Sequence, residues 1–275
     1  MKKKKILILT AVIATIIIIG GSIWYFNFQR PRNIAIKEYK STVELIEKKN
    51  TEIDKTTLKL QALIDSNEKP LNENIIVSAK DIIQKAEVLK VIIKKMPDKT
   101  DDIIVATKEL SDPIDNSGFI KELNDIYTNL DMSIKQFKQL TNPKEEFVIQ
   151  RLKTIDEITD VQGVTEDNDP NGKLNKAGGY TATVYFVSKN VNQSEVYGSN
   201  LIDKGTDAGG SIEVYATQED AIERNEYLAI FDGGIFSSGS HRVVGTMVIR
   251  TSNLLTASQQ KTLEEKIFNA MIDLK

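Results

Sequence analysis

Residues 167–174, with the sequence DNDPNGKL, are spaced like the first part of a calcium-binding loop. Asp167, Asp169 and Asn171 would supply oxygen ligands at loop positions 1, 3 and 5, with a glycine at position 6. The twelfth position, where such loops place a bidentate glutamate, is Gly178. Two interpretations follow: a weak Ca²⁺ site formed by Asp167, Asp169 and Asn171, or a tight Asp-Pro-Asn-Gly turn that needs these residue types for its backbone. We favour the turn.

The only histidine of the chain, His241, follows serines at positions 237, 238 and 240. With an acid such as Asp232 or Asp207, a Ser-His-Asp hydrolase site can be drawn from these residues. The chain has no G-x-S-x-G elbow, and Ser240 directly beside His241 is not the spacing of a triad. A hydrolase is therefore the weaker alternative, and we predict no catalytic residue.

The glycine-rich segment 205–210, GTDAGG, is a candidate phosphate cradle. It precedes a predicted strand rather than a helix, and it lacks the lysine of a P-loop. We therefore expect its glycines to form a hairpin or a bulge. Apart from the weak calcium candidate, no cofactor is predicted.

The N-terminus of the chain predicts a membrane anchor. Residues 6–26 are apolar and uncharged, and a helix of this length spans about 30 Å, the hydrocarbon thickness of a bilayer. Four lysines at 2–5 precede this segment and only Arg30 and Arg32 closely follow it, which favours a cytoplasmic N-terminus. A cleaved signal peptide is the alternative, but the bulky residues 24–26 (WYF) stand where a cleavage site has small ones.

Composition limits the partners and the redox chemistry. The 275 residues include no cysteine, which excludes disulfides, cysteine-based zinc sites and a lipid-modified cysteine. Residues 27–143 carry 19 basic and 19 acidic side chains, whereas residues 144–275 carry 13 basic and 20 acidic ones. Nucleic-acid-binding domains have the opposite balance, so we expect no nucleic acid partner.

Residues 27–143 have the periodicity of a helical bundle. Apolar side chains recur every three or four residues over 36–64, the pattern of a coiled-coil seam, with Asn50 and Thr57 at equivalent positions. Further helices are predicted at 75–93, 101–110 and 120–137, with breaks at Pro97 and at 112–118. The seam faces neighbouring helices of the same chain, which we favour, or a second copy of the chain. The oligomeric state stays open.

Residues 144–275 combine turn-rich segments with short β-branched and aromatic runs, which predicts an α+β domain. We expect helices from Pro143 toward Asp156, from Thr217 to Phe231 and from Thr256 to Leu274, and strands at 180–187, 211–215 and 242–250. Thr217 and Thr256 are expected helix N-caps. The helices are expected to cover one side of a small sheet. The predicted fold is therefore α+β, with a lysine cap and transmembrane helix (1–26), a helical bundle spacer (27–143) and a C-terminal domain (144–275).

Three spaced pieces of the C-terminal domain, at 169–180, 209–224 and 245–250, carry a resemblance. They resemble the C-terminal domain of uncharacterised membrane-anchored extracytoplasmic proteins of Gram-positive bacteria, some of which carry an Ebh-like label. The resemblance leaves the helical bundle out. It implies an extracytoplasmic location and brings no known activity, ligand or catalytic residue.

These features predict a single-pass protein of the cell membrane. Residues 6–26 would hold it in the membrane, with the N-terminus in the cytoplasm and the C-terminal domain outside the cell. A compact domain at the end of a spacer favours a non-catalytic binding module for an unknown extracellular or cell-envelope partner. The alternatives are a structural or oligomerising envelope protein and an extracytoplasmic hydrolase.

Overall fold

The computed structural model describes residues 2–111, 117–234 and 239–274, with side chains described from Ile8 onward. It is α+β, as predicted, and it divides into two compact units. The N-terminal unit comprises the residues up to Asn67 together with Asn74–Asn129, and the C-terminal unit comprises Glu68–Glu73 and Leu130–Lys275. Residues 112–116 of the break expected at 112–118, and the serines at 237 and 238, lie outside the described residues, whereas residues 117 and 118 already belong to a helix. The division of the chain at residues 26 and 143 stays a prediction.

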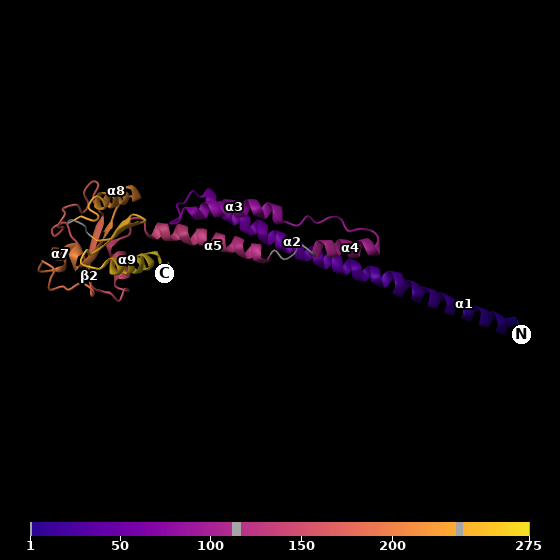
Figure 1. The fold of residues 1–275 in the computed structure, drawn as a ribbon. Coiled ribbons are helices and arrows are strands. Elements are labelled where there is room, and N and C mark those ends of the chain that lie inside the picture. Colours follow the sequence, from indigo (N-terminus) through magenta and orange to yellow (C-terminus); the bar gives the residue numbers. More distant parts are fainter. Residues whose placement is uncertain (1, 112–116, 235–238, 275) are drawn as a thin grey trace. The chain divides into compact units, whose positions relative to one another are not determined.

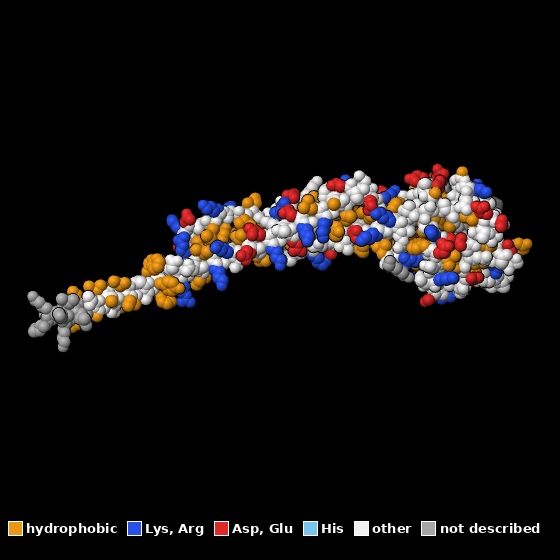
Figure 2. Space-filling model, turned by 180° about the vertical axis from the view of Figure 1, so that it is seen from behind, with side chains coloured by type: hydrophobic (Ala, Val, Ile, Leu, Met, Phe, Trp, Pro, Cys, Tyr) orange, Lys and Arg blue, Asp and Glu red, His pale blue; other side chains and the backbone are white. Residues whose placement is uncertain are grey.

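The N-terminal helix has two contrasting parts. α1 (Lys2–Trp24), a π turn (Tyr25–Gln29) and α2 (Arg30–Asp65) follow one another without a break. Among the described residues this is the one helix long and apolar enough to cross a membrane, and every described side chain from Ile8 to Phe28 is exposed. Figure 2 shows hydrophobic side chains along this segment, whereas acidic and basic side chains mix over the helices that follow.

Pro31 gives a physical reason for the π turn. A proline inside a helix has no N–H to donate, and its ring crowds the carbonyl four residues earlier. The turn before Pro31 is widened, and the N–H of Arg30 bonds to the carbonyl of Tyr25, five residues back. Such a wide turn gives the proline ring room while the helix continues.

The bundle core lies between α2 and the helices that run beside it, α3 (Asn74–Leu89) and α4 (Thr100–Ser111) (Figure 1). α5 (Ser117–Gln139) follows. Along the predicted seam of α2, Tyr39, Ile46, Ile53 and Leu60 are buried and the seam residues between them are half-buried, as expected for one stripe of a helix. The buried apolar side chains of one cluster are Ala35, Tyr39, Ile46, Ile103 and Leu110.

Asn50 explains why α3 ends earlier than predicted. The helix expected to continue to residue 93 stops at Leu89, and the following segment leaves the helical path. The side-chain amide of Asn50 donates to the carbonyl of Val91 at 2.9 Å and accepts from its N–H at 3.2 Å. Asn50 thereby takes both backbone groups that Val91 would need in a helix. The seam position faces a backbone of the same chain, as favoured, although not that of a helix.

We predict that Asn50→Leu lowers the free energy of unfolding by about 1–3 kcal/mol, because it leaves both backbone groups of Val91 without their partner. Thr57→Val is the matched control. The Thr57 hydroxyl is buried and has no hydrogen-bond partner among the described residues, so its removal should cost little or stabilise. Denaturant unfolding of both variants tests this, and a stabilised Asn50→Leu would contradict it.

The C-terminal unit is built on a five-stranded antiparallel sheet with the order β1-β2-β3-β5-β4. The strands are β1 (Ile158–Gly163), β2 (Ala182–Ser188), β3 (Gly209–Val214), β4 (His241–Val244) and β5 (Met247–Thr251). Three regions were predicted as strands, and the described residues form five strands. β1 was missed because half of its sequence, ITDVQG, is polar and the strand lies at the sheet edge.

The prediction of one strand over 242–250 is wrong, because the segment is a hairpin. Val244 and Met247 pair across a two-residue turn in which Gly245 has a φ of 61°. A glycine at the first central position is typical of a tight hairpin turn. The N–H of Thr246 donates to the carbonyl of Leu140 at 3.0 Å, so the hairpin tip is held at the end of α5.

Helices cover both faces of the sheet, not one side as predicted (Figure 1). The helices that cover the sheet are α6 (Glu145–Leu152), α7 (Leu201–Lys204), α8 (Gln218–Ala229) and α9 (Ala257–Ile272). Alternation along β2 sends Val184 and Phe186 toward α6 and α9, and Tyr185 toward α7 and α8. A strand buried on both faces carries apolar residues at nearly every position, and β2, ATVYFVS, does so.

The caps predicted for the last two helices are confirmed. Thr217 accepts from the N–H of Asp220 at the start of α8, and Thr256 forms a capping box with Gln259 at the start of α9. The prediction for α6 is wrong in its bounds, since this helix begins at Glu145 and ends at Leu152. Lys144 is the N-cap residue of α6, and Asn142, with a φ of 44°, lies two residues before it.

Candidate functional site

A buried carboxylate lies on the sheet face beneath α8. Glu213 of β3 is 2% exposed. Arg224 of α8 donates from Nε to Oε2 at 2.7 Å and from Nη2 to Oε1 at 3.0 Å. Arg250 of β5 donates from Nη1 to Oε1 at 2.7 Å, and the hydroxyl of Tyr215 donates to Oε2 at 2.8 Å. These four residues, here named the Glu213 cluster, place two guanidinium groups on one carboxylate.

The ionised state of Glu213 is held by its partners. Burial opposes ionisation, but the hydrogen bonds of Arg224 and the charge of Arg250 outweigh it, so the pKa of Glu213 lies below its ordinary value. Burial and the neighbouring Glu213 carboxylate both raise the pKa of Tyr215. Tyr215 therefore stays a hydrogen-bond donor, and the cluster carries a formal charge of one positive unit.

The local sequence places each member of the cluster. In β3 the residues Ser211 and Glu213 point to the α8 face, while Ile212 and Val214 enter the opposite core. Arg250 pairs directly with Ser211 across β3 and β5, so its side chain emerges on the same face as Glu213. The Thr217 cap fixes where α8 begins, and this start brings Arg224 over the carboxylate.

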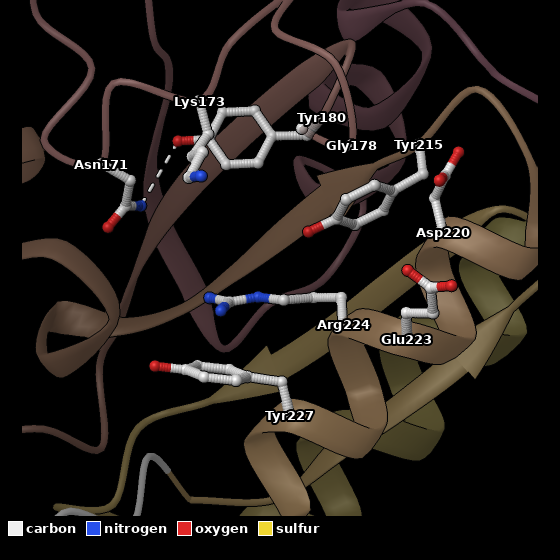
Figure 3. Close-up of a pocket in the computed structure, with 10 residues that line it drawn as sticks. Asn171, Lys173, Gly178, Tyr180, Tyr215, Asp220, Glu223, Arg224 and Tyr227 are labelled. Atoms are coloured by element: carbon white, nitrogen blue, oxygen red, sulfur yellow. Dashed lines mark hydrogen bonds between the residues drawn. The ribbon is translucent and has the colours of Figure 1, made fainter.

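An open cavity of about 510 Å³ lies beside the cluster, between α8 and the loop that precedes β2 (Figure 3). Its size is in the range of small-molecule sites. The loop contributes Asn171, Lys173, Gly178 and Gly179, the sheet region contributes Tyr180 and Tyr215, and α8 contributes Asp220, Glu223, Arg224 and Tyr227. Arg224 belongs to both the cluster and the cavity wall, so the buried ion pairs fix one side of the cavity.

Three tyrosine rings give the cavity its apolar surface. Tyr180 and Tyr215 meet edge to face, with ring centroids 6.3 Å apart. Tyr227 is 53% exposed, and the Arg224 guanidinium lies 5.5 Å from its ring centroid. Two rings are thus held in the domain and the third stands at the rim, a combination suited to contact with a ligand.

The segment considered for calcium forms the loop wall of this cavity. The N–H of Gly172 bonds to the carbonyl of Asp169 at 3.2 Å, and Gly172 has a φ of 59°, so the favoured Asp-Pro-Asn-Gly turn is present. The Asp169 carboxylate accepts from the N–H groups of Asn171, Lys173 and Leu174 and from the Tyr180 hydroxyl. Asp169 thereby organises the loop.

The three candidate calcium ligands have different surroundings. Burial disfavours the charge of Asp169, but the hydrogen bonds from Tyr180 and the three amides prevail and lower its pKa. Asp167 and Asn171 are exposed, and the Asn171 amide donates to the Tyr180 hydroxyl at 3.3 Å. No group of three acids or histidines placed to hold a metal occurs within the described residues. Calcium binding by Asp167, Asp169 and Asn171 stays a prediction. A Ca²⁺ ion on Asp169 would compete with the Tyr180 hydroxyl and the three backbone amides for the carboxylate oxygens.

His241 lies on β4 with partners other than serine. Its Nδ1 is 2.8 Å from Oδ1 of Asn225, and its Nε2 is 3.2 Å from both carboxylate oxygens of Asp232. Ser240 pairs instead with the Thr251 hydroxyl at 2.8 Å. The structure thus brings Asp232 to His241, as considered for a hydrolase, but it turns Ser240 to a different partner.

The glycines of 205–210 were expected in a hairpin or a bulge, and this expectation is wrong. Gly205–Ala208 form a short 3-10 turn, and Gly209 and Gly210 begin β3. A Cβ on Gly210 would lie 2.2 Å from the carbonyl oxygen of Arg250 and 2.3 Å from the Phe186 ring. The glycine is needed because the neighbouring strand and the core approach too closely for a side chain.

Comparisons with protein-family models, with curated proteins and with solved structures found no match for this chain. The resemblance to Gram-positive membrane-anchored proteins therefore stays a prediction. Sequence reasoning assigned no role to Glu213, Arg224 or Tyr227, although a glutamate within the apolar strand sequence SIEVY is a signal of a buried ion pair.

We predict that Glu213→Gln lowers the free energy of unfolding at pH 7 by about 3–5 kcal/mol, because two partly buried guanidinium groups lose their buried counter-charge. The folded pKa of Glu213 lies below its ordinary value of 4.5. The ionised Glu213 therefore contributes its full stabilisation at a pH above 4.5, and this contribution is lost as the pH falls through the folded pKa. The stabilities of wild type and variant should therefore converge in acid. Glu226→Gln, an exposed change on α8, is the control and should stay within about 0.5 kcal/mol of wild type. A difference between wild type and Glu213→Gln that did not vary with pH would contradict the assignment.

For the loop, we predict that calcium at 2 mM changes the melting temperature of wild type little, since an incomplete loop binds at about 10⁻³ M or more weakly. Asp169→Asn should lower the melting temperature equally in calcium and in chelator, because it weakens hydrogen bonds to backbone amides. Thermal scans of wild type, Asp167→Ala and Asp169→Asn in both solutions test this. A large calcium-dependent rise that Asp167→Ala abolishes would establish a metal site.

Proposed function

We propose that the protein is a single-pass membrane protein that presents a non-catalytic binding domain outside the cell on a helical spacer. The observation that carries this proposal is the open cavity beside the Glu213 cluster, with Tyr227 exposed at its rim. Buried ion pairs fix one wall and a hydrogen-bonded loop forms the other, so the cavity exists before a ligand arrives. Its partner is a component of the cell envelope or of the extracellular medium.

The membrane part of the proposal rests on the N-terminal helix. The side chains from Ile8 to Phe28 are exposed and nearly all apolar, and burial in a bilayer removes such a surface from water. The lysines at 2–5 favour retention of the N-terminus in the cytoplasm. On this topology the C-terminal unit faces the exterior.

We propose to test location and binding together on bacterial protoplasts that carry the full chain. Fluorescently labelled, soluble fragments of cell-envelope material are added from outside. Wild-type protoplasts should bind the label and Tyr227→Ser should lose most of this binding, because Tyr227 offers its ring at the rim. Ile230→Ser is the matched control: it removes a 75% exposed apolar side chain that follows α8 and lies outside the cavity lining.

Each alternative outcome has its own meaning. Equal binding by wild type, Tyr227→Ser and protoplasts without the protein would overturn the binding role and favour a structural one. Binding that appears only after the protoplasts are permeabilised would overturn the topology and keep the cavity as the site.

A further inference from the structure

The cavity between α8 and the loop before β2 separates its charges. Figure 3 shows the amine of Lys173 and the guanidinium of Arg224 on one side, and the carboxylates of Asp220 and Glu223 on the other. The Tyr215 ring lies between the two sides (Figure 3). The lining thus carries two formal positive and two formal negative charges, with an aromatic surface between them.

The four charged side chains differ in the hydrogen bonds and ion pairs that they already make within the protein. Arg224 commits Nε and Nη2 to Glu213, which orients the guanidinium and leaves Nη1 for a ligand. Asp220 accepts from the Thr217 hydroxyl at 2.6 Å through one oxygen. Lys173 and Glu223 are exposed, and among the described residues neither side chain makes an ion pair within 4.0 Å. Both ends of the cavity therefore retain capacity for a charged group.

A lining with both signs selects against a ligand of one sign. An anion is attracted by Lys173 and Arg224 but repelled by Asp220 and Glu223. A simple cation is attracted by the two acids and repelled by the two basic side chains. A molecule with an anionic and a cationic group at opposite ends is complementary to both. A carboxylate accepts from guanidinium and ammonium donors, and a primary ammonium donates to carboxylates.

The middle of the cavity fits a short, weakly polar connection between those groups. Tyr215 offers its ring between the two sides, and on the side of Lys173 and Arg224 the lining adds the Tyr227 ring and the Asn171 amide, which can hydrogen-bond a peptide group (Figure 3). A volume of about 510 Å³ accommodates a small molecule rather than a folded partner.

We propose that this cavity binds a short zwitterionic peptide, with its carboxylate at Lys173 and Arg224 and its ammonium at Asp220 and Glu223. This inference rests on the proposed binding function and names the class of ligand. It gives Asp220 a role beyond that of an acid in the first turn of α8, where it also interacts favourably with the helix dipole, and it gives Glu223 a role as well.

The test uses tri-alanine as the probe and the full chain in detergent, with calorimetric titration as the measurement. Tri-alanine with free ends should bind, and both its N-acetylated form and its C-terminal amide should bind about fivefold more weakly, the upper range for one exposed charge pair. Glu223→Gln should reduce the penalty of N-acetylation and keep that of amidation. Lys173→Gln should do the opposite, since each variant removes one of the two partners of one peptide end.

Matched controls lie on the same two elements. Glu226→Gln on α8 and Lys176→Gln in the loop remove the same charges outside the cavity lining and should leave both penalties unchanged. Equal affinity for free and capped peptides would overturn the charge pairing while leaving a peptide-binding cavity. Absence of binding by every form, with envelope fragments still bound by protoplasts through Tyr227, would overturn the peptide and leave the proposed function intact. A penalty of N-acetylation that is as large in Glu223→Gln as in wild type would overturn the placement of the ammonium.

Discussion

The C-terminal unit depends on one buried carboxylate. Glu213 lies on a strand covered on both faces, and a charge in that position is costly unless it is paired and hydrogen-bonded. Arg224 and Arg250 supply the pairing from a helix and from a neighbouring strand. The requirement is mutual, because each guanidinium is also largely removed from water. Helix α8, strand β3 and strand β5 are therefore held in one relative placement by charge as well as by apolar packing.

That constraint reaches the cavity through Arg224. The guanidinium contacts Glu213 on one side and lines the open space on the other, so the hydrogen bonds to the buried carboxylate also orient the cavity wall. The opposite wall depends on a second carboxylate, Asp169, which accepts hydrogen bonds from backbone N–H groups and from the Tyr180 hydroxyl. The two carboxylates therefore have different structural roles. Glu213 joins elements that are distant in sequence, and Asp169 stabilises a local loop.

Local signals predicted much of the fold. The apolar stripes located the helices of the bundle, and Thr217 and Thr256 were recognised as caps because the capping pattern is complete within four residues. Predictions failed where a distant contact decides the outcome. α3 ends at Leu89 because Asn50, far away in sequence, takes the backbone groups of Val91. The cavity could not be predicted, since the sheet topology alone brings Lys173 and Glu223 to opposite walls of one cavity. Within the site, the Asp-Pro-Asn-Gly turn was predictable from residue types, whereas its hydrogen bond to Tyr180 was not.

The π turn at Tyr25–Gln29 has a consequence for the two surfaces of the N-terminal helix. A π turn contains one residue more than an α turn, and each residue of an α-helix advances by about 100° around the axis. The positions that pack in the bundle, beginning at Ala35, are therefore offset by this angle from where an unbroken α-helix would put them relative to the segment before Trp24. This single extra residue sets which side of the apolar segment is continuous with the bundle core and which side is continuous with the solvated face. The geometry of this one turn therefore links the orientation of the apolar segment about its axis to the face of α2 that is buried in the bundle.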